Sequence, residues 1–260
     1  MQAATLAFAL FEQELPEVLF LSIRAGAAML AAPLFGAMSV PVQLRAFFGV
    51  ALAVFVHQWL PLPALPDLFS MAGLVAILQE VAVGFAMGFV LQIAFAIPLI
   101  AAEQIAGTMG MAMATSVDPA SGSQSGAIGQ MFSLTLIFVF LGIGAHLLWF
   151  ELLLESYRAL PPGPLVLGAD AMQRIVAFGG QMLTTAAAIA LPVVLVLLLV
   201  QIATGVLSRS APSLNLFALG LPAGVLAGIA ALIAVLPVVI DQFAEVARTA
   251  VDEAAAVVAR

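Results

Sequence analysis

Residues 103–129 read EQIAGTMGMAMATSVDPASGSQSGAIG and interrupt a chain that otherwise consists of long apolar segments. Glycine and serine recur through this stretch and one proline falls within it, so it cannot continue the segment before it as a straight helix. Lipid offers no hydrogen bonds to free backbone N–H and C=O groups, so a break at membrane depth must reach water or line a protein-walled cavity. We therefore expect a glycine-rich central loop here, in a position typical of functional sites.

The composition around this loop indicates the class of protein. Of 260 residues, 64% are hydrophobic and 8% are charged, whereas soluble domains carry about 25% charged residues. The sequence therefore predicts an all-α integral membrane protein in contact with membrane lipid. The net charge of −7 and the absence of lysine argue against a nucleic-acid partner.

The apolar segments predict kinked helical hairpins. We expect helices over residues 15–35, 46–66, 71–102 and 128–150, a proline-rich connection over 151–174, and two charge-free runs over 175–208 and 210–240. Each charge-free run would span about 45–50 Å as a straight helix, against about 30 Å for the hydrocarbon core of a bilayer. Kinks at the internal prolines would absorb part of this excess. Residues 241–260 have apolar positions at helical spacing and predict an amphipathic tail.

Two sets of glycines recur every four residues. Gly84 and Gly88 predict that another helix approaches closely, because small residues four apart leave one helix face without side chains. Gly220, Gly224 and Gly228 form a second such face, for which we favour close helix packing over pore lining.

Three charged residues lie in or beside apolar segments. An unpaired charge there costs at least about 2.5–3.5 kcal/mol, so we expect Arg24 to pair with Glu80 or Glu103, with the choice left open, and proton or ion relay as the alternative. The two histidines, His57 and His146, are interpreted as structural or partner-facing residues and not as metal ligands. We predict no metal site and no cofactor.

An enzymatic function is not favoured. Serines of the central loop precede His146, but the five-residue frame Gly122–Gly126 has Gln124 at its centre and is therefore not a nucleophile elbow. The chain also has no Walker A lysine, no H-E-x-x-H sequence and no dinucleotide-binding fingerprint after a strand.

Several motifs in order along the chain carry a family resemblance. They are Arg24, Ala32-Pro33-Leu34-Phe35-Gly36, Arg45, Glu80, Val117-Asp118-Pro119, Gly144-Ala145-His146 and, from Arg209 to Pro222, the string RSAPSLNLFALGLP. In this order the sequence resembles the FliR/SctT family of type III secretion export-gate subunits over essentially its whole length.

The resemblance implies a place in a helical hetero-oligomeric export gate at the bacterial inner membrane, in the flagellar basal body. Residues 1–160 would resemble the P-type gate subunit and include the plug loop 103–129, and residues 161–260 would resemble the Q-type subunit with the amphipathic tail. The implied partners are the P-type and Q-type small membrane subunits, the larger export-gate membrane protein, and unfolded exported proteins as substrate. An injectisome gate is the first alternative; a secondary transporter that uses Arg24, Glu80 and Glu103 as coupling charges is the second.

By position, the family's plug corresponds to residues 107–119. Methionines are polarizable and adopt many rotamers, so they suit a deformable seal, and glycines permit the loop to refold; packing of the loop on adjacent helices is the alternative. The predicted plug residues are Gly107, Met109, Gly110, Met111, Met113, Asp118 and Pro119. The predicted structural or subunit-contact residues are Arg24, Arg45, Glu80, Glu103, His146, Arg209, Pro212, Gly220, Gly224 and Gly228.

Overall fold

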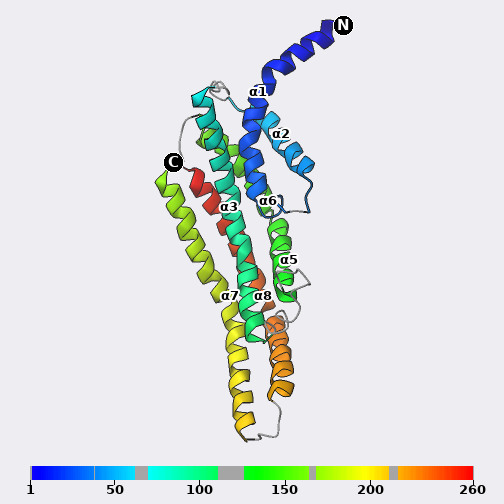
Figure 1. Cartoon of the computed structure of the whole chain (residues 1–260), viewed down its shortest axis with the longest axis vertical. Coiled ribbons are helices and arrows are strands. Elements are labelled where there is room, and N and C mark those ends of the chain that lie inside the picture. The colour runs from blue at the N-terminus through cyan, green and yellow to red at the C-terminus, as the bar shows by residue number, and fades with distance from the viewer. Residues whose placement is uncertain are drawn as a thin grey trace. The chain divides into compact units, whose positions relative to one another are not determined.

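The computed structural model describes residues 2–37, 39–61, 70–110, 126–163, 168–210 and 216–259. Within these ranges all regular structure is helical, which confirms the predicted all-α class. The helices are α1 (Gln2–Ala31), α2 (Val42–Trp59), α3 (Met71–Thr108), α5 (Ala127–Gly142), α6 (Ala145–Ala159), α7 (Ala169–Ser210) and α8 (Leu216–Val258) (Figure 1).

Several of these helices are long and apolar enough to cross a membrane. Four helices of the described chain meet this condition by length and composition, and a fifth span results if the bent pair α5 and α6 counts as one. The 42 residues of α7 correspond to about 63 Å of helix, twice the hydrocarbon thickness of a bilayer. The protein is therefore an integral membrane protein with helices that exceed the bilayer, as the charge-free runs predict.

The chain groups into two compact units that interleave along the sequence. Unit 1 comprises Met1–Ile93, Gly144–Phe178 and Arg248–Arg260, and unit 2 comprises Ala94–Ile143 and Gly179–Ala247. The units are defined by contacts within this chain. The predicted boundary at residue 160 was instead based on resemblance to two other subunits, and it therefore stays a prediction.

Two of the unit boundaries coincide with weak points of long helices. Unit 2 begins in α3 at Ala94, the residue whose carbonyl lacks its helical donor because Pro98 has no N–H. It resumes in α7 at Gly179, which is followed by Gly180, a pair with little intrinsic helix preference.

Unit 1 is built on close packing of α1 against α2 and α3. Helices α1 and α2 lie side by side (Figure 1), where an added Cβ on Gly49 would be 3.5 Å from the Cα of Gly26. On α3, a Cβ on Gly84 would overlap the carbonyl oxygen of Arg24, and one on Gly88 would lie 2.7 Å from the Cβ of Ala31. The close helix approach predicted from Gly84 and Gly88 is therefore confirmed, and the approaching helix is α1.

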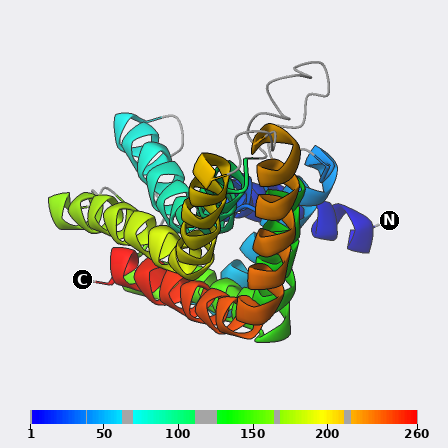
Figure 2. The same ribbon diagram turned by 90° about the horizontal axis from the view of Figure 1, so that it is seen from below.

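Unit 2 is packed by aromatic side chains and by the C-terminal hairpin. The rings of Phe132 and Phe243 meet edge to face at 5.6 Å, and those of Phe95 and Phe140 do so at 5.3 Å. The hairpin consists of the later part of α7 and the first part of α8, which Figure 2 shows from below. Edge-to-face pairs of this kind add specific orientation to apolar burial.

The predicted single helix over residues 128–150 is wrong. The chain ends α5 at Gly142, turns through Ile143 and Gly144, and starts α6 at Ala145 with a bend of 66°. Gly144 has a φ of +75°, a left-handed conformation that glycine adopts without a steric penalty. Hydropathy is continuous across this turn, so only the two glycines signal it.

The predicted connection over residues 151–174 is also mostly helical. Helix α6 continues to Ala159 and α7 begins at Ala169. The charged residues of this part of α6 are exposed, while Trp149, Leu153 and Tyr157, spaced four apart, are buried. An amphipathic helix accounts for this alternation better than a loop does.

The tail of α8 has the amphipathic character predicted for residues 241–260. Its buried side chains include Phe243, Val246, Ala250, Val251, Ala254 and Val257. Asp241, Arg248 and Asp252 are exposed on the other side, so the apolar positions read from the sequence do form one packed face.

Candidate functional site

Arg24 of α1 is fully buried in unit 1, and all five of its N–H groups are paired. Its Nε and Nη2 donate to the two carboxylate oxygens of Glu80 at 2.8 and 2.7 Å. Its Nη1 donates to the carbonyl oxygen and Oγ of Ser156 at 2.8 and 3.2 Å, and Nη2 also donates to the carbonyl oxygen of Leu160 at 2.8 Å. Arginine has five N–H donors, so the structure supplies the acidic partner that the sequence left open, and that partner is Glu80.

Tyr157 completes this group, which we call the Arg24 cluster (Arg24, Glu80, Ser156, Tyr157 and Leu160). The guanidinium carbon lies 4.3 Å from the centre of the Tyr157 ring, a cation–π distance. The Tyr157 hydroxyl donates to the carbonyl oxygen of Leu21 at 2.6 Å. The cluster thus joins α1, α3 and α6.

Burial determines what the Arg24 cluster can do. The side chains of Arg24 and Glu80 are both 0% exposed, and the arginine has no N–H left for a further ligand. Removing one partner of such a buried pair leaves an uncompensated charge. The arrangement therefore suits fixed packing of three helices better than relay of protons to water.

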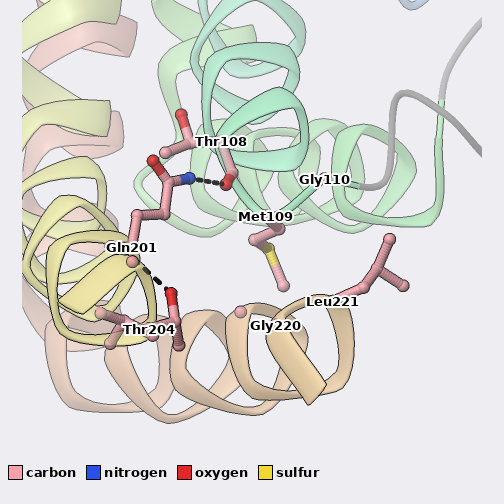
Figure 3. Close-up of a pocket in the computed structure, with 10 residues that line it drawn as sticks. Thr108, Met109, Gly110, Gln201, Thr204, Gly220 and Leu221 are labelled. Atoms are coloured by element: carbon pink, nitrogen blue, oxygen red, sulfur yellow. Dashed lines mark hydrogen bonds between the residues drawn. The ribbon is translucent and has the colours of Figure 1, made fainter. Parts of the chain in front are cut away.

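The second candidate site is the C-terminal end of α3, in unit 2. The helix ends at Thr108, and the backbone N–H groups of Met109 and Gly110 donate to the carbonyl oxygens of Ile105 and Gly107 at 2.9 and 3.1 Å. Gly110 has a φ of +82°, the left-handed conformation that often terminates helices. The side-chain amide of Gln201, on α7, donates to the carbonyl oxygen of Thr108 at 2.8 Å (Figure 3).

Met109 is 2% exposed and packs on two glycines of α8, with its side chain on Gly228 and its backbone on Gly224. A Cβ added to Gly228 would lie 2.7 Å from Cγ and Cε of Met109, and one added to Gly224 would lie 3.3 Å from its carbonyl oxygen. We call Gly224 and Gly228 the glycine face. At these two positions the glycine spacing of α8 serves close packing, whereas a Cβ on Gly220 would meet nothing within 4 Å.

Met109 lines two cavities of unit 2. The first, partly polar and open, has a volume of about 270 Å³ and is shown in Figure 3. Its lining residues are Thr108, Met109, Gly110, Val200, Gln201, Thr204, Gly205, Gly220, Leu221 and Gly224. The second, almost wholly apolar, has a volume of about 330 Å³ and lies among Met109, α5 and α8. A flexible thioether therefore lies beside free volume on two sides, which suits a side chain that changes position.

The other predicted plug residues are only partly described. Gly107 lies in the last turn of α3, where an added Cβ would meet nothing within 4 Å. A Cβ added to Gly110 would lie 3.7 Å from Cδ1 of Leu221. Met111, Met113, Asp118 and Pro119 lie outside the described residues, so their predicted role stays a prediction.

The remaining predicted residues are dispersed over the two units. The guanidinium of Arg45 donates to the carbonyl oxygens of Ala37 and Val40, which closes the turn between α1 and α2. Glu103 is exposed on α3, His146 is half-buried in the first turn of α6, and Arg209 is exposed in the last turn of α7. Pro212 lies outside the described residues.

His57 has acidic neighbours that sequence reasoning missed. Its ring nitrogens lie 3.5 Å from a carboxylate oxygen of Glu17 and 4.0 Å from one of Glu14. Among the described residues no group of three or more His, Cys, Asp or Glu side chains could hold a metal ion. The contact is therefore interpreted as pairing between α1 and α2.

Sequence reasoning also missed Gln201 and Tyr157. Gln201 is a polar residue within the charge-free run 175–208, and Tyr157 is the single tyrosine of the chain. For Gln201 the available signal was a hydrogen-bonding side chain in a run without charges, because such a group needs a partner where water is excluded. For Tyr157 it was the four-residue spacing from the apolar residue Leu153.

Comparisons with known proteins agree on one family. A family model described as bacterial export proteins, family 1, matches residues 15–250. The flagellar biosynthetic protein FliR of Pectobacterium carotovorum subsp. carotovorum is 32% identical over 223 residues, which cover 86% of this chain and 85% of the relative. FliR of Escherichia coli (strain K12) is 30% identical over 217 residues, 84% of this chain and 83% of the relative. The surface presentation of antigens protein SpaR of Salmonella typhimurium is 33% identical over 187 residues, 72% of this chain and 68% of the relative.

Proposed function

Since the chain belongs to family 1 of the bacterial export proteins, we propose that it is a subunit of the flagellar type III protein export gate and that its central loop plugs the closed pore. Membership in the family makes the chain a membrane component of a type III export apparatus. The finer proposal adds the P-type and Q-type small membrane subunits and the larger export-gate membrane protein as partners, with unfolded flagellar proteins as substrate.

The observation that carries the plug proposal is the environment of Met109. This residue lies at the end of α3, directly before Gly110 and the rest of the predicted plug. It packs on the glycine face with its side chain on Gly228 and its backbone on Gly224, beside two cavities. A channel for unfolded chains must close against ions, and a flexible thioether in contact with a smooth helix face can seal an irregular gap.

The exposed apolar surface supports a hetero-oligomer. Along α7 many large side chains are exposed, among them Leu183, Leu191, Leu195, Leu199, Ile202 and Val206. A helix of about 63 Å cannot be covered by a single bilayer core. Neighbouring membrane subunits would bury the part that lipid does not reach.

Two other functions are less well supported. The injectisome alternative rests on the similarity to SpaR, which matches 72% of this chain, whereas the FliR proteins of Pectobacterium carotovorum and Escherichia coli match 86% and 84% of it. For a transporter, the proposed coupling charges would have to change partners, yet Arg24 and Glu80 are buried and fully paired while Glu103 is exposed elsewhere. We propose no catalysis by this chain.

The proposal can be tested by deleting Thr108–Met113 and co-expressing the variant with the P-type and Q-type partners. We expect the purified hetero-complex to assemble and to conduct small ions in vesicles, whereas the wild-type complex does not. A substitution of the exposed Met172 on α7, M172A, serves as the control for loss of a methionine.

An assembled deletion complex without a leak would remove the plug from this segment. Failure of the wild-type chain to form any complex with these partners would contradict the gate itself and favour the transporter.

A further inference from the structure

The end of α3 is held by contacts from two other helices of unit 2. The last carbonyl groups of a helix have no partner within it, and that of Thr108 accepts from the Gln201 amide of α7. The next residue, Met109, packs on the glycine face of α8. Figure 3 shows Gln201 reaching Thr108 from one side, with Met109 directed toward α8.

These contacts restrain the chain without fixing it permanently. The polar contact is one neutral hydrogen bond, which is weaker than a charge-assisted one. Gln201 is exposed on the surface of the chain, so the other side chains of this chain do not enclose the bond. The Met109 side chain has three rotatable bonds and lies beside cavities of about 270 and 330 Å³, so it has room to leave the glycine face.

The glycine face admits Met109 only because it lacks side chains. Any residue with a Cβ at position 228 would displace Met109, since that atom would come within 2.8 Å of its Cγ, Sδ and Cε. At position 224 the Cβ would press on the Met109 backbone at 3.3 Å. These glycines therefore set where the chain that follows α3 begins.

We propose that Gln201 and the glycine face form a reversible latch that holds Thr108 and Met109 in the closed gate and must release them for export. This inference rests on the proposed plug function and names the regulation of that site. Gln201 is a positioning residue here: it acts on the plug through the carbonyl group of Thr108.

A disulfide can test whether release is required, because the chain contains no cysteine. Cβ and Cγ of Met109 are one carbon–carbon bond of about 1.5 Å apart. The Cβ positions of residues 109 and 228 therefore lie at most about 4.2 Å from each other, and disulfides span about 3.5–4.5 Å. In the double variant M109C/G228C, the shorter side chain at position 109 also makes room for the one at 228.

The experiment uses the assembled hetero-complex in cells and compares export under oxidising and reducing conditions. We expect the oxidised double variant to lose export and the reductant to restore it, while M109C and G228C alone do not respond to the oxidant. Full cross-linking with export at the wild-type rate would overturn the latch.

A second variant tests Gln201 without a cross-link. Q201L keeps the size of the side chain and removes the donor, and Q181L changes an exposed glutamine elsewhere on α7. If one neutral hydrogen bond biases the gate, the ion leak of Q201L should rise by between about twofold and tenfold with assembly unchanged, and that of Q181L should not.

An unchanged leak in Q201L would overturn the role of Gln201. The Thr108–Met113 deletion separates the two proposals: a leaking deletion together with a freely exporting cross-linked variant rejects the latch and keeps the plug. A deletion complex that assembles and does not leak ions would reject the plug proposal.

Discussion

The two ends of α3 are held in opposite ways. In unit 1, Glu80 lies in the Arg24 cluster, where a buried ion pair, two carbonyl acceptors and an aromatic ring fix three helices. In unit 2, Thr108 is held by one exposed neutral hydrogen bond and Met109 by a smooth glycine face. Low-stability segments are the usual source of moving parts, so we interpret the first region as scaffold and the second as the part that moves.

The largest effect is expected from separating Arg24 and Glu80. R24M or E80L leaves one buried charge without its partner, which costs about 3–5 kcal/mol. Both variants should lower the thermal unfolding temperature of the purified complex strongly. The double variant R24M/E80L removes both charges and should be more stable than the sum of the single losses predicts. Additive losses in this double-mutant cycle would contradict the pairing.

A smaller but still large effect is expected where α3 meets α1. In G84A the new Cβ would collide with the Arg24 carbonyl oxygen, and backbone cannot move aside as a side chain can. Overpacking costs about 1–3 kcal/mol and at times more, and we expect the upper end here. G180A is the matched control, because its Cβ would meet nothing within 4 Å. Equal amounts of both variants in membranes, with equal thermal stability, would contradict this packing.

Substitution of the glycine face should separate stability from gating. In G228A the Cβ meets a flexible side chain, so Met109 shifts and the loss of stability should stay at about 1 kcal/mol, the low end for overpacking. The ion leak of the complex should nevertheless rise, because Met109 leaves its closed position. G180A on α7, whose Cβ meets nothing within 4 Å, should leave the ion leak unchanged. If the G228A complex leaked no more ions than the wild type, the glycine face would have no role in the latch, and Gln201 would be its one remaining restraint.

Some features of the two ends of α3 could be predicted from the sequence, and others could not. Glycines spaced by four residues and a buried arginine are local signals, so the approach of a helix to Gly84 and the need of Arg24 for an acid could be predicted. The choice of Glu80 over Glu103 could not, because it depends on which turns of α3 face α1. The function came from motifs spread over the whole chain, and the family model that covers residues 15–250 supports it.

The errors of prediction have physical causes of their own. The break at Gly144 was missed because apolar residues continue on both sides of it, and the helical residues 151–159 were interpreted as a connection because of their polarity. Their buried neighbours at four-residue spacing were the better signal. Gln201 was missed because one neutral side chain hardly alters the hydropathy of a long apolar helix, although its hydrogen-bonding need persists.

The smallest predicted effect tests how much redundancy the Arg24 cluster has. Y157F removes the hydroxyl that donates to Leu21 and keeps the ring over the guanidinium. One hydrogen bond is worth about 0.5–1.5 kcal/mol, so the melting temperature should fall slightly and the ion leak should stay at the wild-type level. Y157L removes the ring as well, so its melting temperature should fall further than that of Y157F, because the cation–π contact is lost too. A leak in Y157F would mean that the scaffold of unit 1 also controls the gate, and the contrast between a fixed and a moving end of α3 would then fail.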